Sequence, residues 1–283
     1  MTALDAVDLE VPGAGITCVL GANGAGKTTL LETASGLRRL TSGDLAVLGR
    51  APGAPANRQE LGVMLQDGGL PGSARPAEFL AYIARLYPHP RNVAEVMASV
   101  EIDDCARTPI RRLSGGQAKR VAWAAAMIGN PTAMMLDEPT TALDPVGRAR
   151  MHEVLDAQRT AGSAIVLSTH LIEDVSALAD FVVVMRAGSV VLRGTPGELR
   201  PRDRIELRAP SHLDVDALLD ALPIGSTCME ITPGLYRVQV PGDIDPGTVA
   251  TLTSWCAQHG VPPEVSIADL GSVIRDAIGG RVT

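Results

Sequence analysis

A glycine-rich octapeptide near the N-terminus constrains the fold more than any other feature of this sequence. Residues 21–28 are GANGAGKT, which matches the phosphate-loop pattern G-x-x-x-x-G-K-[ST] in full. An apolar, β-branched run (Ile16–Leu20) precedes the loop, and helical spacing follows it from Thr29 onward. A strand, a glycine loop and a helix form the arrangement in which backbone N–H groups surround the phosphates of a nucleotide.

The lysine of this loop strengthens the prediction. Lys27 is one of only two lysines in the chain, and it occupies the one position where the pattern requires a lysine. Its ammonium would reach the β- and γ-phosphates, and the Thr28 hydroxyl would bind Mg²⁺. The chain is therefore predicted to bind a nucleoside triphosphate. The predicted nucleotide-binding residues are Gly21, Ala22, Asn23, Gly24, Ala25, Gly26, Lys27, Thr28 and Thr29.

The order of the expected elements predicts an α/β fold for the first two-thirds of the chain. Strands are expected at Ile16–Leu20, Leu45–Leu48, Leu61–Leu65, Thr132–Leu136, Ala164–Leu167 and Phe181–Met185. Longer helical patterns separate most of them, which is typical of a mostly parallel sheet covered by helices. Ala187-Gly188-Ser189 predicts a hairpin turn. Between Asp67 and Leu113 helical patterns replace the strands, which indicates an inserted helical subdomain at about residues 68–130.

A change of pattern at Pro201 marks a second domain. We expect an ATPase-type domain over residues 1–200 and a small α+β domain over residues 201–283, which ends in a helix at Ile267–Ile278. The second domain carries no chemical motif.

Composition excludes several classes of protein. The net charge of −7 argues against binding to nucleic acid through neutralised phosphates. No apolar run approaches the length of about 18 to 20 residues that spans a bilayer. The four cysteines are scattered without a C-x-x-C pair, which predicts reduced thiols in a cytoplasmic protein.

Two acids end one of the expected strands. The run Thr132–Leu136 leads directly into Asp137 and Glu138. An aspartate at the carboxyl end of a buried strand brings a carboxylate toward Mg²⁺ beside a phosphate loop. Glu138 could then orient or deprotonate the attacking water. Taken alone, the pair could simply end the strand at a turn.

A second glycine-containing segment makes the pattern specific. Ser114, Gly115, Gly116 and Gln117 follow Leu113 and precede a helix, which predicts another anion site at a helix N-terminus. Taken alone, the segment could equally be an exposed turn and N-cap. Together with the phosphate loop, the string LSGGQ resembles that of the ATP-binding subunits of ABC transporters, and the resemblance extends over most of residues 4–200. It implies a P-loop NTPase fold of ABC type, with ATP and Mg²⁺ as cofactors.

The resemblance assigns roles to further residues. Gln66 matches the Q-loop glutamine, which contacts Mg²⁺ and the attacking water, so the implied metal-binding residues are Thr28, Gln66 and Asp137. Asp144 matches the D-loop aspartate that helps to join two subunits. His170 matches the switch histidine at the γ-phosphate, and with Glu138 and Lys27 it completes the implied catalytic set.

The family also implies an assembly. Two subunits pair head to tail, so that Ser114–Gln117 of one subunit contacts the nucleotide held by the phosphate loop of the other. We expect a homodimer in preference to a heterodimer, bound to a transmembrane permease at the inner face of the cell membrane. The helices near Trp255 and Ile278 resemble those of subunits that serve ABC-2-type drug and antibiotic exporters, so export is the expected direction.

The sequence departs from the family at its start. Family members usually place an aromatic residue, which stacks on adenine, about fifteen to twenty residues before the phosphate loop. Here no aromatic residue occurs before Phe79. Either the true start lies upstream, or adenine is held without stacking, in which case ATP and GTP should bind equally well.

Two other functions compete with transport. A soluble ABC ATPase that acts on nucleic acid or ribosomes would carry a long coiled-coil or zinc insertion, or two fused halves, and this chain has none of these. A regulatory subunit that binds ATP without hydrolysing it would not need Asp137, Glu138 and His170, which are all present.

Overall fold

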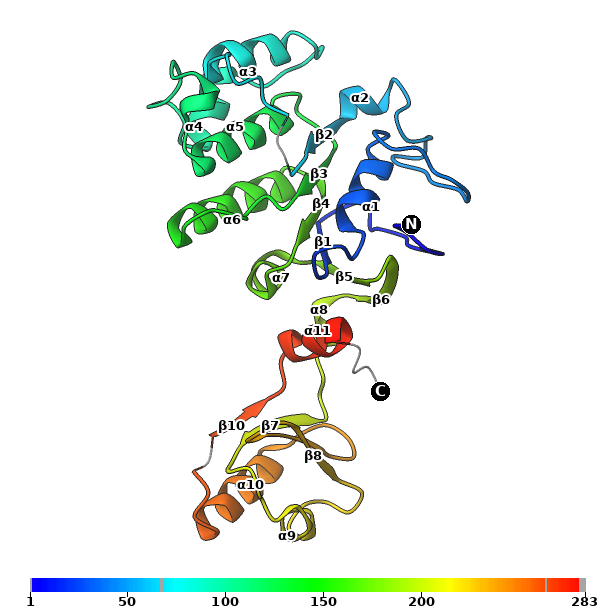
Figure 1. Cartoon of the computed structure of the whole chain (residues 1–283), viewed down its shortest axis with the longest axis vertical. Coiled ribbons are helices and arrows are strands. Elements are labelled where there is room, and N and C mark those ends of the chain that lie inside the picture. Colours follow the sequence, from blue (N-terminus) through cyan, green and yellow to red (C-terminus); the bar gives the residue numbers. More distant parts are fainter. Residues whose placement is uncertain (1, 67–68, 263, 280–283) are drawn as a thin grey trace. The chain divides into compact units, whose positions relative to one another are not determined.

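The chain folds into two units, shown in the computed structural model of Figure 1. The structure describes residues 2–66, 69–262 and 264–279. One unit runs from the N-terminus to Pro196 and includes the residues from Ala277 onward, and the other is Gly197–Asp276.

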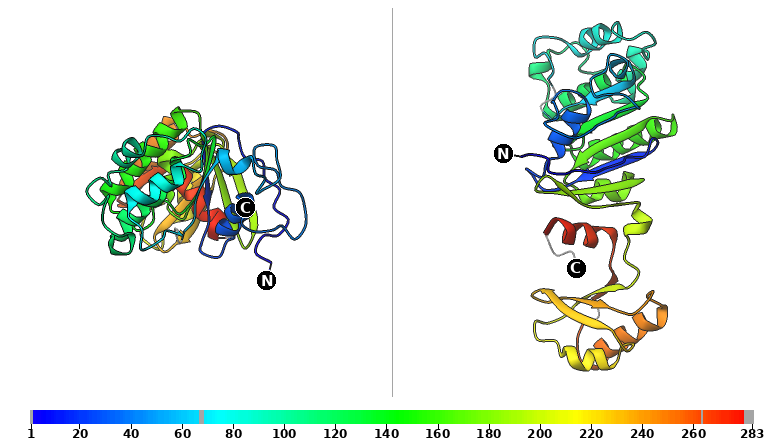
Figure 2. Two further views of the ribbon diagram at one scale, coloured as in Figure 1. Left: turned by 90° about the horizontal axis from the view of Figure 1, so that it is seen from above. Right: turned by 90° about the vertical axis from the view of Figure 1, so that its right-hand side faces the viewer.

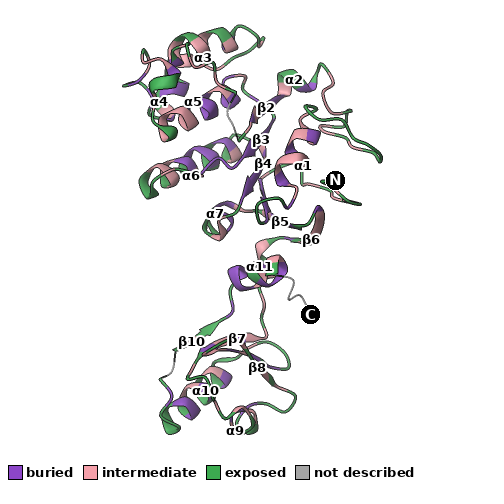
Figure 3. Cartoon of the chain, viewed as in Figure 1, coloured by how far each residue is buried: buried purple, intermediate pink, exposed green. Residues whose placement is uncertain are grey.

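A six-stranded sheet forms the centre of the first unit, in the order β2-β3-β4-β1-β5-β6. Its strands are β1 (Ile16–Leu20), β2 (Leu61–Met64), β3 (Ala133–Asp137), β4 (Ala164–Thr169), β5 (Phe181–Arg186) and β6 (Ser189–Gly194). The first five strands in this order, β2, β3, β4, β1 and β5, run parallel to one another. The sixth strand, β6, pairs antiparallel with β5. Every residue of β1 and β3 is buried, as expected for strands covered on both faces (Figure 3). The predicted α/β fold is confirmed.

Helices cover both faces of this sheet (Figures 1 and 2). Helix α1 lies on one face, whereas α6 and α7 lie on the other. The helices of this unit that lie before β6 are α1 (Lys27–Ala34), α2 (Asn57–Glu60), α3 (Pro76–Ala84), α4 (Val93–Ser99), the 3-10 helix η1 (Ile110–Arg112), α5 (Gly115–Met127), α6 (Pro145–Thr160) and α7 (Ile172–Leu178). Between β2 and β3 the described residues form helices and no strand.

The strand order positions the candidate site. Strands β3, β4 and β1 are neighbours and run parallel, so their carboxyl ends lie at the same edge of the sheet. The phosphate loop follows β1, the two acids end β3, and the histidine follows β4. Three segments far apart in the sequence therefore meet at one edge, where ligands bind in open parallel sheets.

The second unit contains a four-stranded antiparallel sheet in the order β10-β7-β9-β8. Its elements are α8 (Pro196–Leu199, which begins at the boundary), β7 (Arg204–Arg208), α9 (Val215–Asp220), β8 (Thr227–Thr232), β9 (Leu235–Gln239), α10 (Pro246–Gln258), β10 (Glu264–Ile267) and most of α11 (Leu270–Gly279). From β7 to β10 the succession β-α-β-β-α-β and this strand order are those of a ferredoxin-like fold. The side chains of Leu218, Leu252 and Trp255 pack with the sheet into a core of its own.

Local predictions were confirmed at some turns and wrong at two places. The hairpin between β5 and β6 turns at Ala187 and Gly188, both with positive φ, as a two-residue turn requires. Leu45–Leu48 is not a strand: only an isolated bridge joins Val47 to Arg50, because nearby glycines with left-handed backbones (Gly43, Gly49) bend the chain. The last expected helix began too early, since Ile267 ends β10 and α11 starts at Leu270.

Two expectations from composition can also be compared with the structure. All four cysteines are free, as predicted. Over the described ranges, no helix is long and apolar enough to cross a membrane.

Candidate active site

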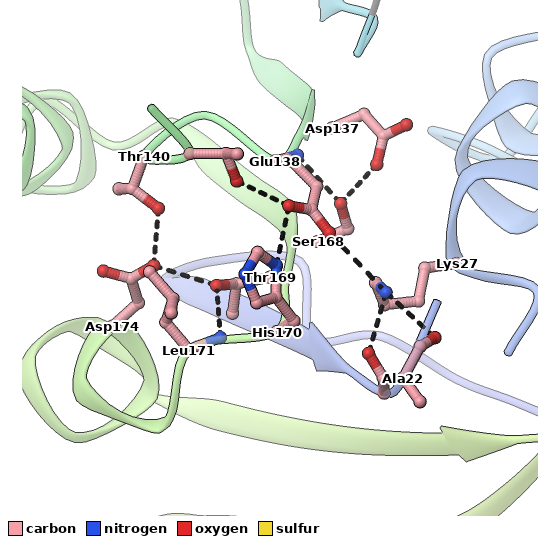
Figure 4. Close-up of polar contacts among 12 residues, drawn as sticks. Ala22, Lys27, Asp137, Glu138, Thr140, Ser168, Thr169, His170, Leu171 and Asp174 are labelled. Atoms are coloured by element: carbon pink, nitrogen blue, oxygen red, sulfur yellow. Dashed lines mark hydrogen bonds and ion pairs between the residues drawn. The ribbon is translucent and has the colours of Figure 1, made fainter. Parts of the chain in front are cut away.

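The phosphate loop joins β1 to α1 and needs glycine at two positions. A Cβ on Gly21 would lie 2.5 Å from the carbonyl oxygen of Met185, so no side chain fits there. Gly26 has φ of 103° at the N-terminus of α1, a backbone conformation that glycine adopts without strain. Lys27 follows as the first residue of α1 and is only 6% exposed. Its ammonium donates hydrogen bonds to the carbonyl oxygens of Gly21 (2.8 Å) and Ala22 (3.3 Å) (Figure 4).

Glu138 lies between two basic side chains. Its Oε1 atom is 3.6 Å from Nζ of Lys27, and its Oε2 atom is 2.8 Å from Nδ1 of His170. The Thr141 hydroxyl also donates to Oε2. The carboxylate is almost fully buried, whereas the imidazole is 42% exposed. The structure thus brings together Lys27, Glu138 and His170, the three residues predicted to be catalytic (Figure 4).

The electrostatics keep Glu138 ionised. Burial by itself raises the pKa of this carboxyl group. The hydrogen bond from Thr141 and the charges of His170 and Lys27 act in the opposite direction and outweigh it, so the pKa lies below the usual range of a glutamate. An ionised carboxylate at neutral pH can accept a proton, which a general base must do.

Asp137 presents a free oxygen to the same region. This residue is fully buried at the end of β3. The Ser168 hydroxyl donates to its Oδ1 atom and accepts a hydrogen bond from the backbone N–H of Glu138 at 2.9 Å. Its Oδ2 atom is buried and has no hydrogen-bond partner among the described residues. A buried carboxylate oxygen without a partner is costly unless a ligand satisfies it, and a divalent cation would do so.

A buried carboxylate forms hydrogen bonds to two loops of the site. The sequence analysis did not predict this residue. Asp174 is fully buried in α7. It accepts hydrogen bonds from the hydroxyls of Thr140 (2.6 Å) and Thr169 (2.9 Å), and His152 Nε2 lies 2.9 Å away. Thr140 stands two residues after Glu138, and Thr169 immediately precedes His170 (Figure 4). Its position four residues after His170 in the sequence was the available signal.

The remaining predicted residues lie in exposed segments. Gln66 is exposed in the turn that follows β2. Ser114 is the N-cap of α5: its hydroxyl accepts from the backbone N–H of Gln117 (3.2 Å), and the Gln117 side chain accepts from the N–H of Ser114 (3.1 Å). Asp144 likewise caps α6 by accepting from the N–H of Gly147 at 2.7 Å.

This unit also has a cavity away from the phosphate loop. Its volume is about 340 Å³, and its lining includes Asn57 of α2, Met64 of β2, Phe79 and Ile83 of α3, and Ala122 of α5. The cavity therefore lies where the inserted helices meet the sheet.

Known proteins are similar to this chain in sequence and in fold. The family model described as ABC transporter matches residues 4–141. An Fe(3+) ions import ATP-binding protein, FbpC of Streptomyces coelicolor, is 35% identical over 270 residues, which are 92% of this chain and 76% of that protein. The chain belongs to the ATP-binding subunits of ABC transporters. The resemblance inferred from the motifs is thereby confirmed at the level of the family.

The relatives of this ABC subunit differ in their named substrates. A daunorubicin resistance ATP-binding protein, DrrA3 of Streptomyces coeruleorubidus, is 34% identical over 248 residues, which are 84% of this chain and 78% of that protein. Other relatives at similar identity are named as import proteins for spermidine/putrescine and for sn-glycerol-3-phosphate. The family is therefore shown, while the direction of transport is not.

Solved structures agree with the fold. The structure of cbiO1 from Clostridium perfringens, described as part of the ABC transporter complex cbiONQ, is 30% identical with a TM-score of 0.60 and covers 70% of this chain and 83% of its own. The ATP-binding cassette MJ0796, solved as a dimer with ADP and Pi, is 23% identical with a TM-score of 0.63 and covers 68% and 90%. As a member of this family, the chain is an ATPase whose hydrolysis of ATP drives transport.

Proposed function

We propose that two copies of this chain bind ATP between them and that Glu138 is the general base for its hydrolysis. The observation that carries this proposal is the buried Glu138 carboxylate between Lys27 and His170. Water would attack the γ-phosphorus, Glu138 would take its proton, and the bond from phosphorus to the β,γ-bridging oxygen would break to release ADP. Lys27 and His170 would stabilise the charge on the transferred phosphoryl group.

Magnesium fits the residues at the end of β3. Asp137 Oδ2 is the buried oxygen that has no partner within the described chain. Thr28 stands next to Lys27 in the phosphate loop, and Gln66 lies in the turn after β2. We propose that these three residues hold Mg²⁺ with the nucleotide, directly or through water, where the ion would neutralise phosphate charge.

The composite site requires a second subunit. Ser114–Gln117 forms a helix N-terminus that is exposed at Ser114 and Gly115, and its capping box is internal to the segment. We propose that this segment contacts the γ-phosphate held by the partner, since backbone N–H groups at a helix N-terminus bind anions. Asp144, exposed at the start of α6, would contact the partner subunit. A homodimer is the simplest assembly, because one chain carries both half-sites.

We propose that the permease binds at the cavity between the inserted helices and the sheet. Phe79, Ile83 and Met64 contribute apolar side chains to its lining, and Gln66 stands two residues after Met64 in the sequence. A permease segment in this cavity would sense movements of the turn at Gln66. The chain would then lie on the cytoplasmic face of the membrane, held there by the permease.

We propose that the direction of transport is export. The pattern of the C-terminal unit resembles that of subunits paired with exporters, and the drug-resistance relative matches 84% of the chain. A relative named for iron import matches 92%, so a direct test is needed.

The test uses the subunit with its co-purified permease in vesicles whose ATP sites face outward. An exporter in this orientation moves substrate into the lumen. We expect ATP-dependent accumulation of daunorubicin in wild-type vesicles and none with Glu138→Gln. ATP-driven release of preloaded ferric ion, without accumulation of the drug, would show import instead.

A further inference from the structure

The second of the two lysines in the chain, Lys119 of α5, contacts Glu138, the proposed general base. Lys119 lies in α5, two residues beyond Gln117, and is half-buried. Its ammonium donates a hydrogen bond of 2.6 Å to the main-chain carbonyl oxygen of Glu138. Neither the phosphate loop nor any of the motif roles assigned above uses this residue.

The carbonyl that Lys119 contacts belongs to a residue with an unusual backbone. Glu138 has φ of 50°, in the left-handed region that side chains other than glycine seldom occupy. Such a conformation persists when surrounding contacts determine it, and it is common at functional sites. A hydrogen bond from a charged donor is among the stronger contacts available, so Lys119 helps to fix this peptide. The orientation of the peptide decides whether the carboxylate reaches Lys27 and His170.

The contact connects two segments that serve different nucleotides. In the proposed dimer, Ser114–Gln117 at the start of α5 contacts the ATP of the partner, whereas Glu138 acts on the ATP held by its own subunit. Lys119 lies in α5, the helix that Ser114–Gln117 begins, and donates a hydrogen bond to the backbone of Glu138.

We propose that Lys119 is a positioning residue that couples the two ATP sites of the dimer. Binding of the partner's nucleotide at the N-terminus of α5 is transmitted through Lys119 to the left-handed backbone of Glu138, so each site is most active when both are filled. This inference rests on the proposed composite site.

The same helix supplies a matched control. Arg120 follows Lys119 and donates a hydrogen bond of 3.2 Å to the carbonyl oxygen of Glu101, which also has a left-handed backbone (φ 56°). At both positions, a charged side chain of α5 donates a hydrogen bond to the carbonyl oxygen of a glutamate whose backbone is left-handed. Only Lys119 reaches a residue of the candidate active site.

The experiment compares Lys119→Met, Lys119→Arg and Arg120→Met in the full chain bound to its permease. Steady-state hydrolysis is measured against ATP concentration, and equilibrium binding is measured with the nucleotide alone. For Lys119→Met we expect kcat to fall by about tenfold or more, the scale for loss of one charge-assisted hydrogen bond. We also expect the cooperativity of hydrolysis to disappear while the Kd for ATP changes by less than about twofold.

The other two variants separate positioning from folding. Lys119→Arg retains a charged donor and should restore most of kcat and the cooperativity. Arg120→Met should keep both at wild-type values. If Lys119→Met hydrolyses ATP like wild type, or if wild type itself shows no cooperativity, the proposed coupling is wrong. Equal losses of kcat in Lys119→Met and Arg120→Met would indicate a merely structural role.

The outcome is distinguishable from failure of the proposed function. Wild-type activity that persists in Glu138→Gln would refute the role of Glu138 itself. Wild-type behaviour of Lys119→Met together with an inactive Glu138→Gln would refute only the coupling.

Discussion

The centre formed by Lys27, Glu138 and His170 and the segment Ser114–Gln117 differ in what satisfies their polar groups. In the centre, each charged side chain contacts groups from other elements, and the Glu138 carboxylate alone has three partners. In the segment, the polar contacts are a capping box between its own residues, and Ser114 is exposed. The fold of a single chain brings the residues of the centre together. The contacts of the segment, in contrast, only cap its own helix. Changes in the centre should therefore lower activity and stability together, whereas a change in the segment can lower activity without lowering stability.

The largest effect is expected from Glu138→Gln. The amide keeps the shape of the side chain but cannot accept the proton of water, so kcat should fall by about a hundredfold to ten-thousandfold. ATP should still bind and should hold the dimer together. Steady-state hydrolysis and size-exclusion chromatography with ATP measure both effects. Glu173→Gln, an exposed acid in α7, is the control and should change neither. Unchanged turnover in Glu138→Gln would refute the assigned base.

Lys27→Ala tests the phosphate side of the centre. Removal of the ammonium deletes the predicted charged contacts with the phosphates, which should cost about 3 kcal/mol of binding or roughly a hundredfold in Kd. Titration calorimetry with Mg-ATP measures the change. Arg38→Ala removes a cation that is 57% exposed, and it should leave the affinity unchanged. Near-normal ATP binding by Lys27→Ala would contradict the predicted role of the loop.

Asp174→Asn tests the buried hydrogen bonds that connect Asp174 to the loops of the centre. Burial raises the pKa of Asp174, but the hydrogen bonds from His152, Thr140 and Thr169 outweigh it and hold the pKa below the usual range. A depressed pKa in the folded state stabilises the protein above the pKa of the unfolded chain, and this stability is lost as the pH falls through the folded-state pKa. We expect Asp174→Asn to reduce the free energy of unfolding by about 1–3 kcal/mol at pH 7.

The pH dependence makes this prediction specific. The difference between wild type and Asp174→Asn should be complete at neutral pH and should shrink below about pH 4, where aspartates begin to protonate. Urea unfolding over a series of pH values measures it. Asp156→Asn, an exposed aspartate in α6, should show little difference at any pH. A difference for Asp174→Asn that stays constant down to pH 3 would argue against this account.

The three residues that the motifs and the family resemblance implied lie close together in the structure because of the order of the strands. Once β1, β3 and β4 are taken as parallel neighbours, Lys27, Glu138 and His170 must approach one another at their carboxyl ends. The supporting contacts of Asp174 and Lys119 could not be predicted in this way. Asp174 contacts Thr140 across 34 positions and Lys119 contacts Glu138 across 19, and neither pair shares a local pattern. The start of the last helix was predicted wrongly for a related reason. Strand β10 has only four residues, which are too few to show the alternation of apolar and polar side chains that distinguishes a strand from the helix after it.

The smallest change, Gly116→Ala, gives the sharpest test of the comparison. Gly116 is the second residue of α5, and a Cβ there would meet only Leu143 at an ordinary 3.6 Å. Alanine has the higher helix propensity, so the variant should be more stable by about 0.5–1 kcal/mol. The added methyl group would nevertheless occupy the helix start that we propose faces the partner's nucleotide, so kcat should fall by about tenfold. Gly197→Ala, at the second position of α8 with open space around it, is the control and should retain full activity. Because a destabilised fold cannot explain lower activity in a more stable protein, stability that rises while hydrolysis falls would place the role of Ser114–Gln117 outside its own chain. If Gly116→Ala hydrolyses ATP as fast as wild type, the proposed contact of Ser114–Gln117 with the partner's nucleotide would be contradicted.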